Sequence, residues 1–511
     1  MGFARTQAVG INGVDGHVVT VEAQGSDGLP HFVLSGLPDT ACAQAADRVR
    51  AATATSGLRL RPRRWTVNLS PAGVPKTGSG FDLAIAVALL AADDTLDPAA
   101  VGGTAHLGEV GLDGSIRAVP GVLPMVLAAA QAGVREIMVP AASAREAALV
   151  RAVRVHAVRS LTDVVTHYRA LADGYAPPDH MPTPVPSVPQ TLPDLTDVVG
   201  QVEARTALEV AAAGGHHLLL LGPPGAGKTM LAERLPGLLP PLSEAAALQV
   251  TGIHSVLGVL PRDGALVQRA PFVAPHHGAS MAAVIGGGSG RVRPGAVSRA
   301  HHGVLFLDEA PEFRRDVLDG LRQPVESGEV VIARADRHVR LPARFQLVLA
   351  ANPCPCGRGH GKAAACECTP QARRRYFAKL SGPMLDRIDL RIGVQALTRV
   401  DLAGGAGEPT ESVARRVAQA RAAQEARWAG RSWRVNGEAP GHHLRTSEHR
   451  LPRPVTRDLD AALDRGELTL RGYDRCLRVA WTVSDLDGRG CPTRDDTCFA
   501  LALRTGSGLA A

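Results

Sequence analysis

Lysines and long apolar runs are scarce in this chain. Only four of its 56 basic side chains are lysines. The longest apolar stretches, such as residues 83–92, are too short to cross a bilayer. Residues 1–10 lack the apolar core of a signal peptide. We therefore expect a cytoplasmic protein that has no membrane partner.

Charge and cysteine content exclude further classes of protein. The formal net charge of +7 is carried almost entirely by arginine in an alanine-rich chain, so it is weak evidence for a nucleic-acid partner. Four of the eight cysteines fall within residues 354–368 and the others are scattered, unlike the pattern of a secreted, disulfide-linked domain. A chain of 511 residues, 45% hydrophobic and 21% charged, predicts roughly two to four globular domains.

A glycine-rich loop between a predicted strand and a predicted helix organises the sequence. Residues 218–221 are four leucines, which indicate a buried parallel strand, and the next eight residues fit G-x-x-x-x-G-K-T. The motif consists of Gly222, Pro223, Pro224, Gly225, Ala226, Gly227, Lys228 and Thr229. Such a loop binds the β-phosphate of a nucleotide through its N–H groups and the helix N-terminus. Lys228 then reaches the β- and γ-phosphates, and the Thr229 hydroxyl ligates Mg²⁺. The alternative is a chance glycine-rich turn.

Two further predicted strands end in polar residues. Residues 303–307 precede Asp308 and Glu309, and residues 345–351 precede Asn352. The carboxyl ends of parallel strands meet at one edge of a sheet, so we expect these side chains beside the loop. Asp308 would hold the Mg²⁺ shell and Glu309 would polarise the attacking water.

These motifs stand in an order that resembles AAA+ ATPases. Asp197-Val-Val-Gly-Gln precedes the phosphate loop at the distance usual for the segment that packs on adenine. The resemblance implies ATP as the nucleotide and Asn352 as the sensor 1 residue. An asparagine that only caps a turn is the alternative for Asn352.

An arginine finger is assigned through a second resemblance. Residues 380–390 read Leu-Ser-Gly-Pro-Met-Leu-Asp-Arg-Ile-Asp-Leu and resemble the arginine-finger segment of magnesium chelatases and MCM helicases. This implies that Arg387 acts on the nucleotide of a neighbouring subunit, within a homo-hexameric ring. A local ion pair with Asp386 or Asp389 is the alternative, and no oligomer would follow from it.

The carboxyl-terminal sequence predicts the helical lid of an AAA+ core. Helical patterns cover residues 413–428, 455–465 and 472–486. Residues 468–480 resemble the sensor 2 helix of the same group. Arg478 is the favoured candidate and Arg471 stays open, as does a surface arginine without nucleotide contact.

The amino-terminal sequence resembles that of the YifB/ComM family of magnesium-chelatase-like ATPases. The stretches that carry this resemblance are residues 36–39, 68–71, 76–83 and 107–117, and further signature residues are found within 270–302. The resemblance implies an α+β domain similar in fold to the proteolytic domain of Lon. Gly80 stands where the Lon serine would be, and residues 119–125 contain no lysine, so we expect no peptidase.

The family resemblance also implies a DNA substrate. Residues 329–342 predict a β-hairpin, and in related helicases a hairpin at this place lines the pore. Arg334, Arg337 and Arg340 are therefore candidate contacts to the DNA backbone. ComM-type proteins are DNA motors that promote branch migration in natural transformation.

Cys354, Cys356, Cys366 and Cys368 form two C-x-C pairs separated by nine residues. Four thiolates from two short loops could surround a structural Zn²⁺. Thiols without a metal, or reversible disulfides, remain alternatives.

The sequence thus predicts a multidomain α/β protein with a P-loop AAA+ core and a helical lid. The expected parts are a Lon-like domain without the catalytic dyad at 1–172, a proline-rich linker at 173–193, an ATPase core at 194–400 and a helical lid at 401–511. The predicted activity is ATP hydrolysis by a DNA helicase or branch-migration motor. The alternatives are a magnesium chelatase subunit and an ATP-driven protein remodeller.

Overall fold

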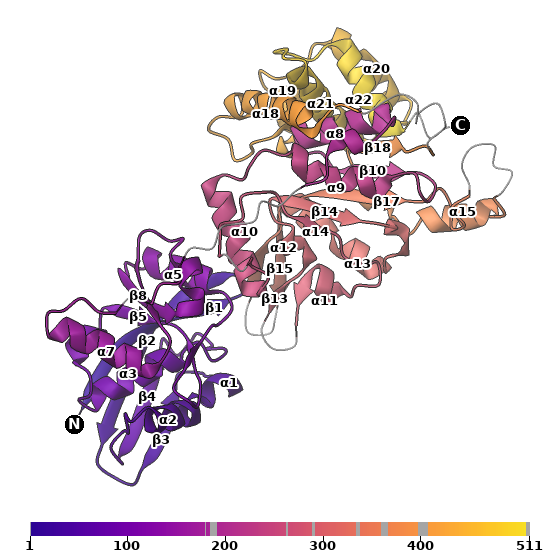
Figure 1. Cartoon of the computed structure of the whole chain (residues 1–511). Helices are drawn as coiled ribbons and strands as arrows, with labels where there is room; N and C mark the ends of the chain where they lie inside the picture. Colours follow the sequence, from indigo (N-terminus) through magenta and orange to yellow (C-terminus); the bar gives the residue numbers. More distant parts are fainter. Residues whose placement is uncertain are drawn as a thin grey trace.

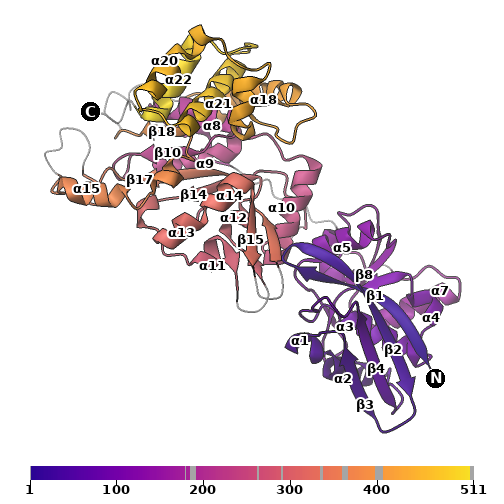
Figure 2. The same cartoon turned by 180° about the vertical axis from the view of Figure 1, so that it is seen from behind.

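The molecule has two lobes, an amino-terminal lobe and a larger lobe that holds the rest of the chain (Figures 1 and 2). The computed structural model describes residues 2–178, 180–183, 192–261, 264–288, 292–333, 338–358, 366–396 and 407–506. None of the described helices is long and apolar enough to cross a membrane. The domain boundaries expected at 172, 193 and 400 remain predictions.

The described part of the amino-terminal lobe contains a mixed sheet of seven strands, in the order β3-β4-β2-β1-β5-β8-β9. The β1/β2 and β2/β4 pairs are antiparallel, and the other neighbours are parallel. The strands are β1 (Phe3–Asn12), β2 (Asp15–Ser26), β3 (His31–Ser35), β4 (Arg64–Ser70), β5 (Thr104–His106), β8 (Glu136–Pro140) and β9 (Arg154–Val158). A separate short hairpin pairs β6 (Glu109–Val110) with β7 (Ile116–Arg117).

The apolar stretch at residues 83–92 lies in α3 (Asp82–Ala92), the central core helix of this lobe. All residues of α3 are buried, because the helix is apolar on every side and packs on β1 and β2. The other helices are α1 (Thr40–Ala43), α2 (Ala45–Thr55), α4 (Pro98–Val101), α5 (Val122–Gln131), α6 (Ala144–Ala147) and α7 (Leu161–Ala172). The α/β mixture was predicted, whereas the likeness to Lon stays a prediction.

The larger lobe is built on a parallel sheet in the order β11-β14-β17-β10-β18. Its strands are β11 (Phe272–Val273), β14 (Gly303–Leu307), β17 (Phe345–Ala351), β10 (Leu218–Leu221) and β18 (Leu390–Gly393). A parallel sheet covered on both faces favours continuous apolar strands, which explains the four leucines of β10 and the buried run of β14. This sheet confirms the parallel α/β core that the motifs predict.

Helices and short strands flank this sheet. They are α8 (Val202–Gly214), α9 (Lys228–Leu238), α10 (Glu244–Leu257), α11 (Met281–Val284), α12 (Ala296–Arg299), α13 (Arg315–Gly320), α14 (Arg322–Ser327), α15 (Pro370–Phe377) and α16 (Gly382–Leu385), with β12 (Gly286–Gly287) paired to β13 (Arg293–Pro294). The predicted hairpin is formed by β15 (Glu329–Ala333) and β16 (His338–Pro342), which pair antiparallel.

The carboxyl-terminal helices pack directly on the parallel sheet and its helices, as Figure 1 shows. Val413, Val417 and Ala420 are buried on one face of α18, at the spacing of helical turns, and this helix packs on α8. The helices are α18 (Thr410–Arg427), α19 (Gly441–Thr446), α20 (Arg453–Asp464), α21 (Leu470–Leu486) and α22 (Arg494–Thr505). One apolar cluster includes Leu218 of β10 and Leu477 of α21, so these helices and the sheet share a core.

The two lobes meet where α10 packs on α5. Val256 of α10 belongs to the apolar cluster of the amino-terminal lobe. At the same place the Gly121 N–H donates to the Ser255 carbonyl over 3.2 Å, and the Ser255 hydroxyl donates to Glu146. Direct contacts between α10 and α5 therefore hold the two lobes together.

Candidate nucleotide site

A cavity lies at the carboxyl edge of the parallel sheet, where β10, β14 and β17 end. It is lined by Pro224, Gly225, Ala226, Gly227, Lys228, Thr229, Met230, Asp308, Glu309 and Asn352. The polar residues predicted after three separate strands therefore do come together, because parallel strands end on the same side of the sheet.

The loop from Gly222 to Thr229 owes its shape to its glycines. Gly225 and Gly227 have φ values of +75° and +90°, a left-handed region that strains any residue with a side chain. A Cβ added to Gly222 would lie 2.2 Å from the Val394 carbonyl oxygen, so this position also admits only glycine. The chain then enters α9 at Lys228, and the first N–H groups of that helix have no partner within it. Such a helix start is suited to bind phosphate.

Lys228 connects the loop to the end of the neighbouring strand. Its Nζ donates to the carbonyls of Gly222 and Pro223 over 2.7 and 2.9 Å and to Oδ1 of Asn352 over 3.1 Å. Burial lowers the pKa of Lys228, while the charges of Asp308 and Glu309 act in the opposite direction. The ammonium group thus lies between the loop and the predicted sensor residue, where a nucleotide phosphate would enter.

An oxygen pair suited to Mg²⁺ lies beside it. The Thr229 hydroxyl donates to Oδ2 of Asp308 over 2.9 Å. Mg²⁺ prefers hard oxygen ligands and usually keeps several waters next to one or two protein groups. A hydroxyl and a carboxylate at this spacing therefore fit the metal expected with a nucleoside triphosphate.

Glu309 has an unusual backbone and a partner that the sequence did not predict. Its φ of +50° is uncommon for a residue with a side chain, and such strain occurs at functional sites. Its Oε2 lies 3.2 Å from Nδ1 of His277. His277 belongs to the signature stretch within residues 270–302, for which the sequence predicts no contact with Glu309. No local sequence pattern predicts this contact, because it follows from the pairing of β14 with β11, the strand that ends shortly before His277.

Arg387 does not line the cavity of its own chain. Its guanidinium lies 2.6 Å from the Glu326 carboxylate and donates to the Pro383 carbonyl over 2.6 Å, with 9% of the side chain exposed. The expected alternative partner Asp389 pairs instead with Arg475 over 2.5 Å. The role of Arg387 therefore stays a prediction, and Glu326 is a partner that sequence reasoning missed.

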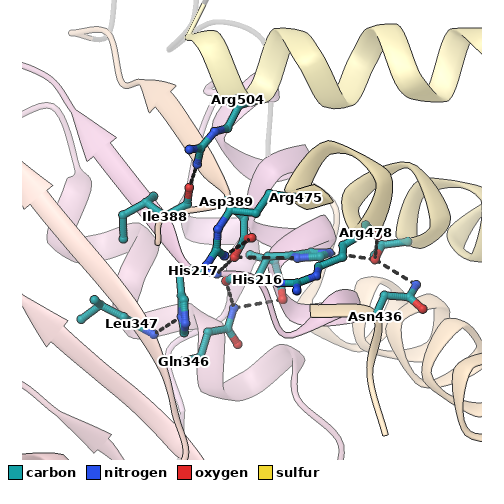
Figure 3. A network of polar contacts seen from close by, with 12 residues as sticks. His216, His217, Gln346, Leu347, Ile388, Asp389, Asn436, Arg475, Arg478 and Arg504 are labelled. Atoms are coloured by element: carbon teal, nitrogen blue, oxygen red, sulfur yellow. Dashed lines mark hydrogen bonds and ion pairs between the residues drawn. The ribbon is translucent and has the colours of Figure 1, made fainter. Parts of the chain in front are cut away.

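The two sensor 2 candidates lie in different surroundings. Arg478 lies in the buried polar network that joins α21 to the base of β10 (Figure 3). Arg471, at the start of the same helix, is largely exposed and lies 3.6 Å from Glu326, the carboxylate that Arg387 also contacts. Neither arginine lines the cavity.

Asp389 is the centre of the network in Figure 3. It accepts a hydrogen bond from the His217 N–H over 2.8 Å and lies 4.0 Å from Nδ1 of His216. Burial alone would raise the pKa of the Asp389 carboxyl, but Arg475 and the neighbouring histidines hold that pKa well below its usual range. Burial lowers the pKa of His216 and of His217 to about 4. Both imidazoles are therefore neutral in the folded protein at neutral pH.

The buried histidines predict loss of stability in mild acid. Unfolding returns His216 and His217 to a pKa of 6.5, so between pH 6.5 and 4 the unfolded chain binds protons that the folded chain does not. The contribution of the two neutral histidines to the free energy of unfolding is complete above pH 6.5. As the pH falls toward 4, the contribution of each histidine decreases by about 1.4 kcal/mol per pH unit. Denaturant unfolding followed by tryptophan fluorescence measures this loss. The His216→Gln/His217→Gln variant should show a shallower pH slope than a His31→Gln control, whose side chain is exposed. An unchanged slope would contradict the assignment.

The remaining predicted residues lie apart from the cavity or outside the described part of the chain. Arg334 and Arg337 lie outside the described residues. Arg340 on β16 is largely exposed and pairs with Glu329 over 3.0 Å. The four clustered cysteines come together, and the first of them, Cys354, stands two residues after Asn352.

Comparisons with known proteins cover nearly the whole chain. Three family sequence profiles match in succession: subunit ChlI of Mg-chelatase at residues 21–143, magnesium chelatase subunit ChlI at 194–402, and the ChlI carboxyl-terminal profile at 407–504. The uncharacterized protein Rv2897c of Mycobacterium tuberculosis is 48% identical over 504 residues, which is 99% of each chain. The competence protein ComM of Haemophilus influenzae is 41% identical over 93% of this chain and 92% of its own. The uncharacterized protein YifB of Escherichia coli is 39% identical over 96% of this chain and 95% of its own.

Proposed function

Because the chain belongs to the YifB/ComM family of magnesium-chelatase-like AAA+ ATPases, we propose that it hydrolyses ATP in a homo-hexameric ring and uses the energy to move on DNA. The observation that carries the ATPase assignment is that Lys228, the Thr229–Asp308 pair and Asn352 line the same cavity and contact one another there. The family itself implies ATP hydrolysis.

The side chains of the cavity divide the chemistry between them. Lys228 and the loop N–H groups bind the phosphates, and Thr229 with Asp308 holds Mg²⁺, which supplies charge neutralisation at the transferring group. Glu309 accepts a proton from the attacking water, and Asn352 orients that water. His277 positions the Glu309 carboxylate through the 3.2 Å contact.

The ring is proposed from the place of two arginines. Phosphoryl transfer in this class of enzyme is accelerated by a guanidinium that balances the charge of the transition state. Arg387 and Arg471 share the Glu326 carboxylate and are absent from the lining of their own chain's cavity. We assign Arg387 as the finger that acts on a neighbouring subunit. The shared Glu326 contact favours Arg471 over Arg478, which lies partly buried in the network of Figure 3, as its companion.

DNA is the proposed substrate of the motor. The Haemophilus influenzae relative carries the name competence protein, and the family resemblance implies work on DNA. Arg340 is exposed on the hairpin and supplies positive charge for the phosphate backbone, and Arg334 and Arg337 precede it in the sequence. The profile names favour the competing possibility of a magnesium chelatase subunit.

Single-stranded, forked and four-way DNA are expected to stimulate ATP hydrolysis severalfold. The stimulation should weaken when Arg334, Arg337 and Arg340 are replaced by alanine, because each lost phosphate contact weakens the binding of DNA. Each lost contact should also reduce the slope of log affinity against log salt concentration by about one. Steady-state hydrolysis at several salt concentrations measures both effects. Arg465→Ala, which removes an exposed arginine paired with Glu467, is the control. Hydrolysis indifferent to every DNA would contradict a DNA substrate and favour a chelatase subunit or a protein remodeller.

A further inference from the structure

The four clustered cysteines place their sulfur atoms in one compact group. The Cys354 Sγ lies 3.2 Å from that of Cys356 and 3.6 Å from that of Cys366, and the Cys356 and Cys366 sulfurs are 3.7 Å apart. With Cys368 included, all four Sγ atoms lie within 4.8 Å of one another. The two C-x-C pairs therefore converge from both ends of the segment that separates them.

These separations match the size of a zinc–tetrathiolate site. Zn–S bonds of about 2.3 Å in a regular tetrahedron put the sulfurs about 3.8 Å apart. A disulfide would require one pair of sulfurs at about 2.05 Å, far shorter than the three separations given above. Four soft thiolate ligands favour Zn²⁺, Cu⁺ or iron over the hard cations Mg²⁺ and Ca²⁺, and a closed set of four cysteines is a usual structural zinc site.

The cluster is joined to the nucleotide site on both sides. Cys354 is buried and stands two residues after Asn352, whose Oδ1 accepts the hydrogen bond from Lys228. On the other side, Cys368 leads directly into α15, whose Tyr376 lies close to Asn352: burial raises the pKa of the Tyr376 hydroxyl to about 12, and the Asn352 backbone acts in the opposite direction. Asn352 therefore lies between the two cysteine segments.

The turn that ends directly after the first cysteine pair lies against the phosphate loop. The Gly357 N–H donates to the Cys354 carbonyl over 3.0 Å and closes a turn. A Cβ added to Gly357 would lie 2.7 Å from Cγ of Pro224, a residue that lines the cavity. Gly357 has a φ of +74°, so this close approach is open only to glycine.

We propose that Cys354, Cys356, Cys366 and Cys368 bind one structural Zn²⁺. This zinc holds Asn352, and Pro224 of the cavity lining, in the positions needed for ATP hydrolysis. The metal links the segment after β17 to the segment before α15, across residues 357–365. All four ligands are thiolates, so no position is left for a catalytic water and the ion does not take part in the reaction. The coupling to hydrolysis rests on the proposed ATPase function, whereas the metal site does not.

Metal analysis of the purified full-length protein tests the site first. One zinc per chain is expected, and it should be lost in Cys366→Ser/Cys368→Ser but kept in Cys491→Ser, which replaces an exposed cysteine outside the cluster. Exchange of the wild-type protein with Co²⁺ should give the visible and near-ultraviolet bands of tetrahedral cobalt–thiolate coordination. This second measurement does not depend on the folding of a variant. Wild-type protein that contains no zinc and takes up no cobalt would overturn the site, whatever its ATPase activity.

Hydrolysis by the same proteins tests the coupling. Loss of zinc is expected to lower kcat by roughly 10²-fold, since a displacement of about 1 Å in a positioning group has an effect of that size. Binding of a fluorescent ATP analogue should change little, because Lys228 and the loop are retained. A zinc-free variant that hydrolyses ATP at the wild-type rate would overturn the coupling. An inactive wild-type protein with one zinc would instead count against the ATPase proposal and leave the site established.

Discussion

Lys228→Ala is expected to abolish measurable ATP hydrolysis, with a fall in kcat/KM of at least roughly 10²–10³-fold. The Nζ of Lys228 is the cation that joins the phosphate loop to Asn352, and no other lysine lines the cavity in the described part of the chain. Without it, the β- and γ-phosphates lose their direct positive partner, so both ATP binding and the chemical step should suffer. A coupled assay of phosphate release measures the effect.

Lys379→Ala is the matched control for this variant. Lys379 pairs with Glu312 over 3.4 Å and does not line the cavity, so its loss should leave hydrolysis unchanged. If Lys228→Ala retained the wild-type rate, the loop from Gly222 to Thr229 could not be the site of hydrolysis.

Arg387→Ala is expected to lower kcat by about 10³–10⁵-fold while ATP binding is preserved. The reason is the division of labour proposed above: the cavity that binds ATP belongs to one chain, and the guanidinium that stabilises the transition state belongs to the next. Equilibrium binding of labelled ATP and steady-state hydrolysis, measured on the same preparation, separate the two quantities. Arg415→Ala is the control, because Arg415 forms only an exposed pair with Glu411 one helical turn away.

A loss of affinity that equals the loss of rate would argue against this assignment. Arg387 is nearly buried against Glu326, so the variant also removes a local ion pair. Thermal unfolding of the variant must therefore be compared with that of the wild type. A large fall in Tm together with a small fall in kcat would mean that Arg387 serves the fold of its own chain.

The parts of the site that the sequence predicted are those set by local structure. The phosphate loop is a short motif whose shape depends on its own glycines, such as Gly225 and Gly227. Asp308 and Asn352 each follow an apolar strand, and parallel strands bring their ends to one edge whatever their order. These residues could therefore be placed together before the order of the strands was known.

The contacts that the sequence missed depend on which elements are neighbours. His277 reaches Glu309 because β11 lies beside β14, and Glu326 meets Arg387 because α14 lies near the segment after α16. Periodicity on α21 could not show that Arg478 lies beside Asp389, because Asp389 immediately precedes β18, far away in the sequence. The strand order of the amino-terminal lobe was likewise beyond local patterns, although the sequence shows the apolar stretch at residues 83–92 that forms most of its core helix.

The most direct test of the central claim, that one chain's ATP site is completed by a neighbouring chain, is to mix two inactive variants. Lys228→Ala keeps Arg387 but lacks its own phosphate lysine, whereas Arg387→Ala keeps an intact cavity without the finger. In a mixed ring, some cavities of the second variant face an intact Arg387 of the first. The account predicts that ATP hydrolysis, absent from each variant alone, reappears on mixing. Mixtures that stay inactive, although mass measurement shows that both variants share one ring, would contradict it.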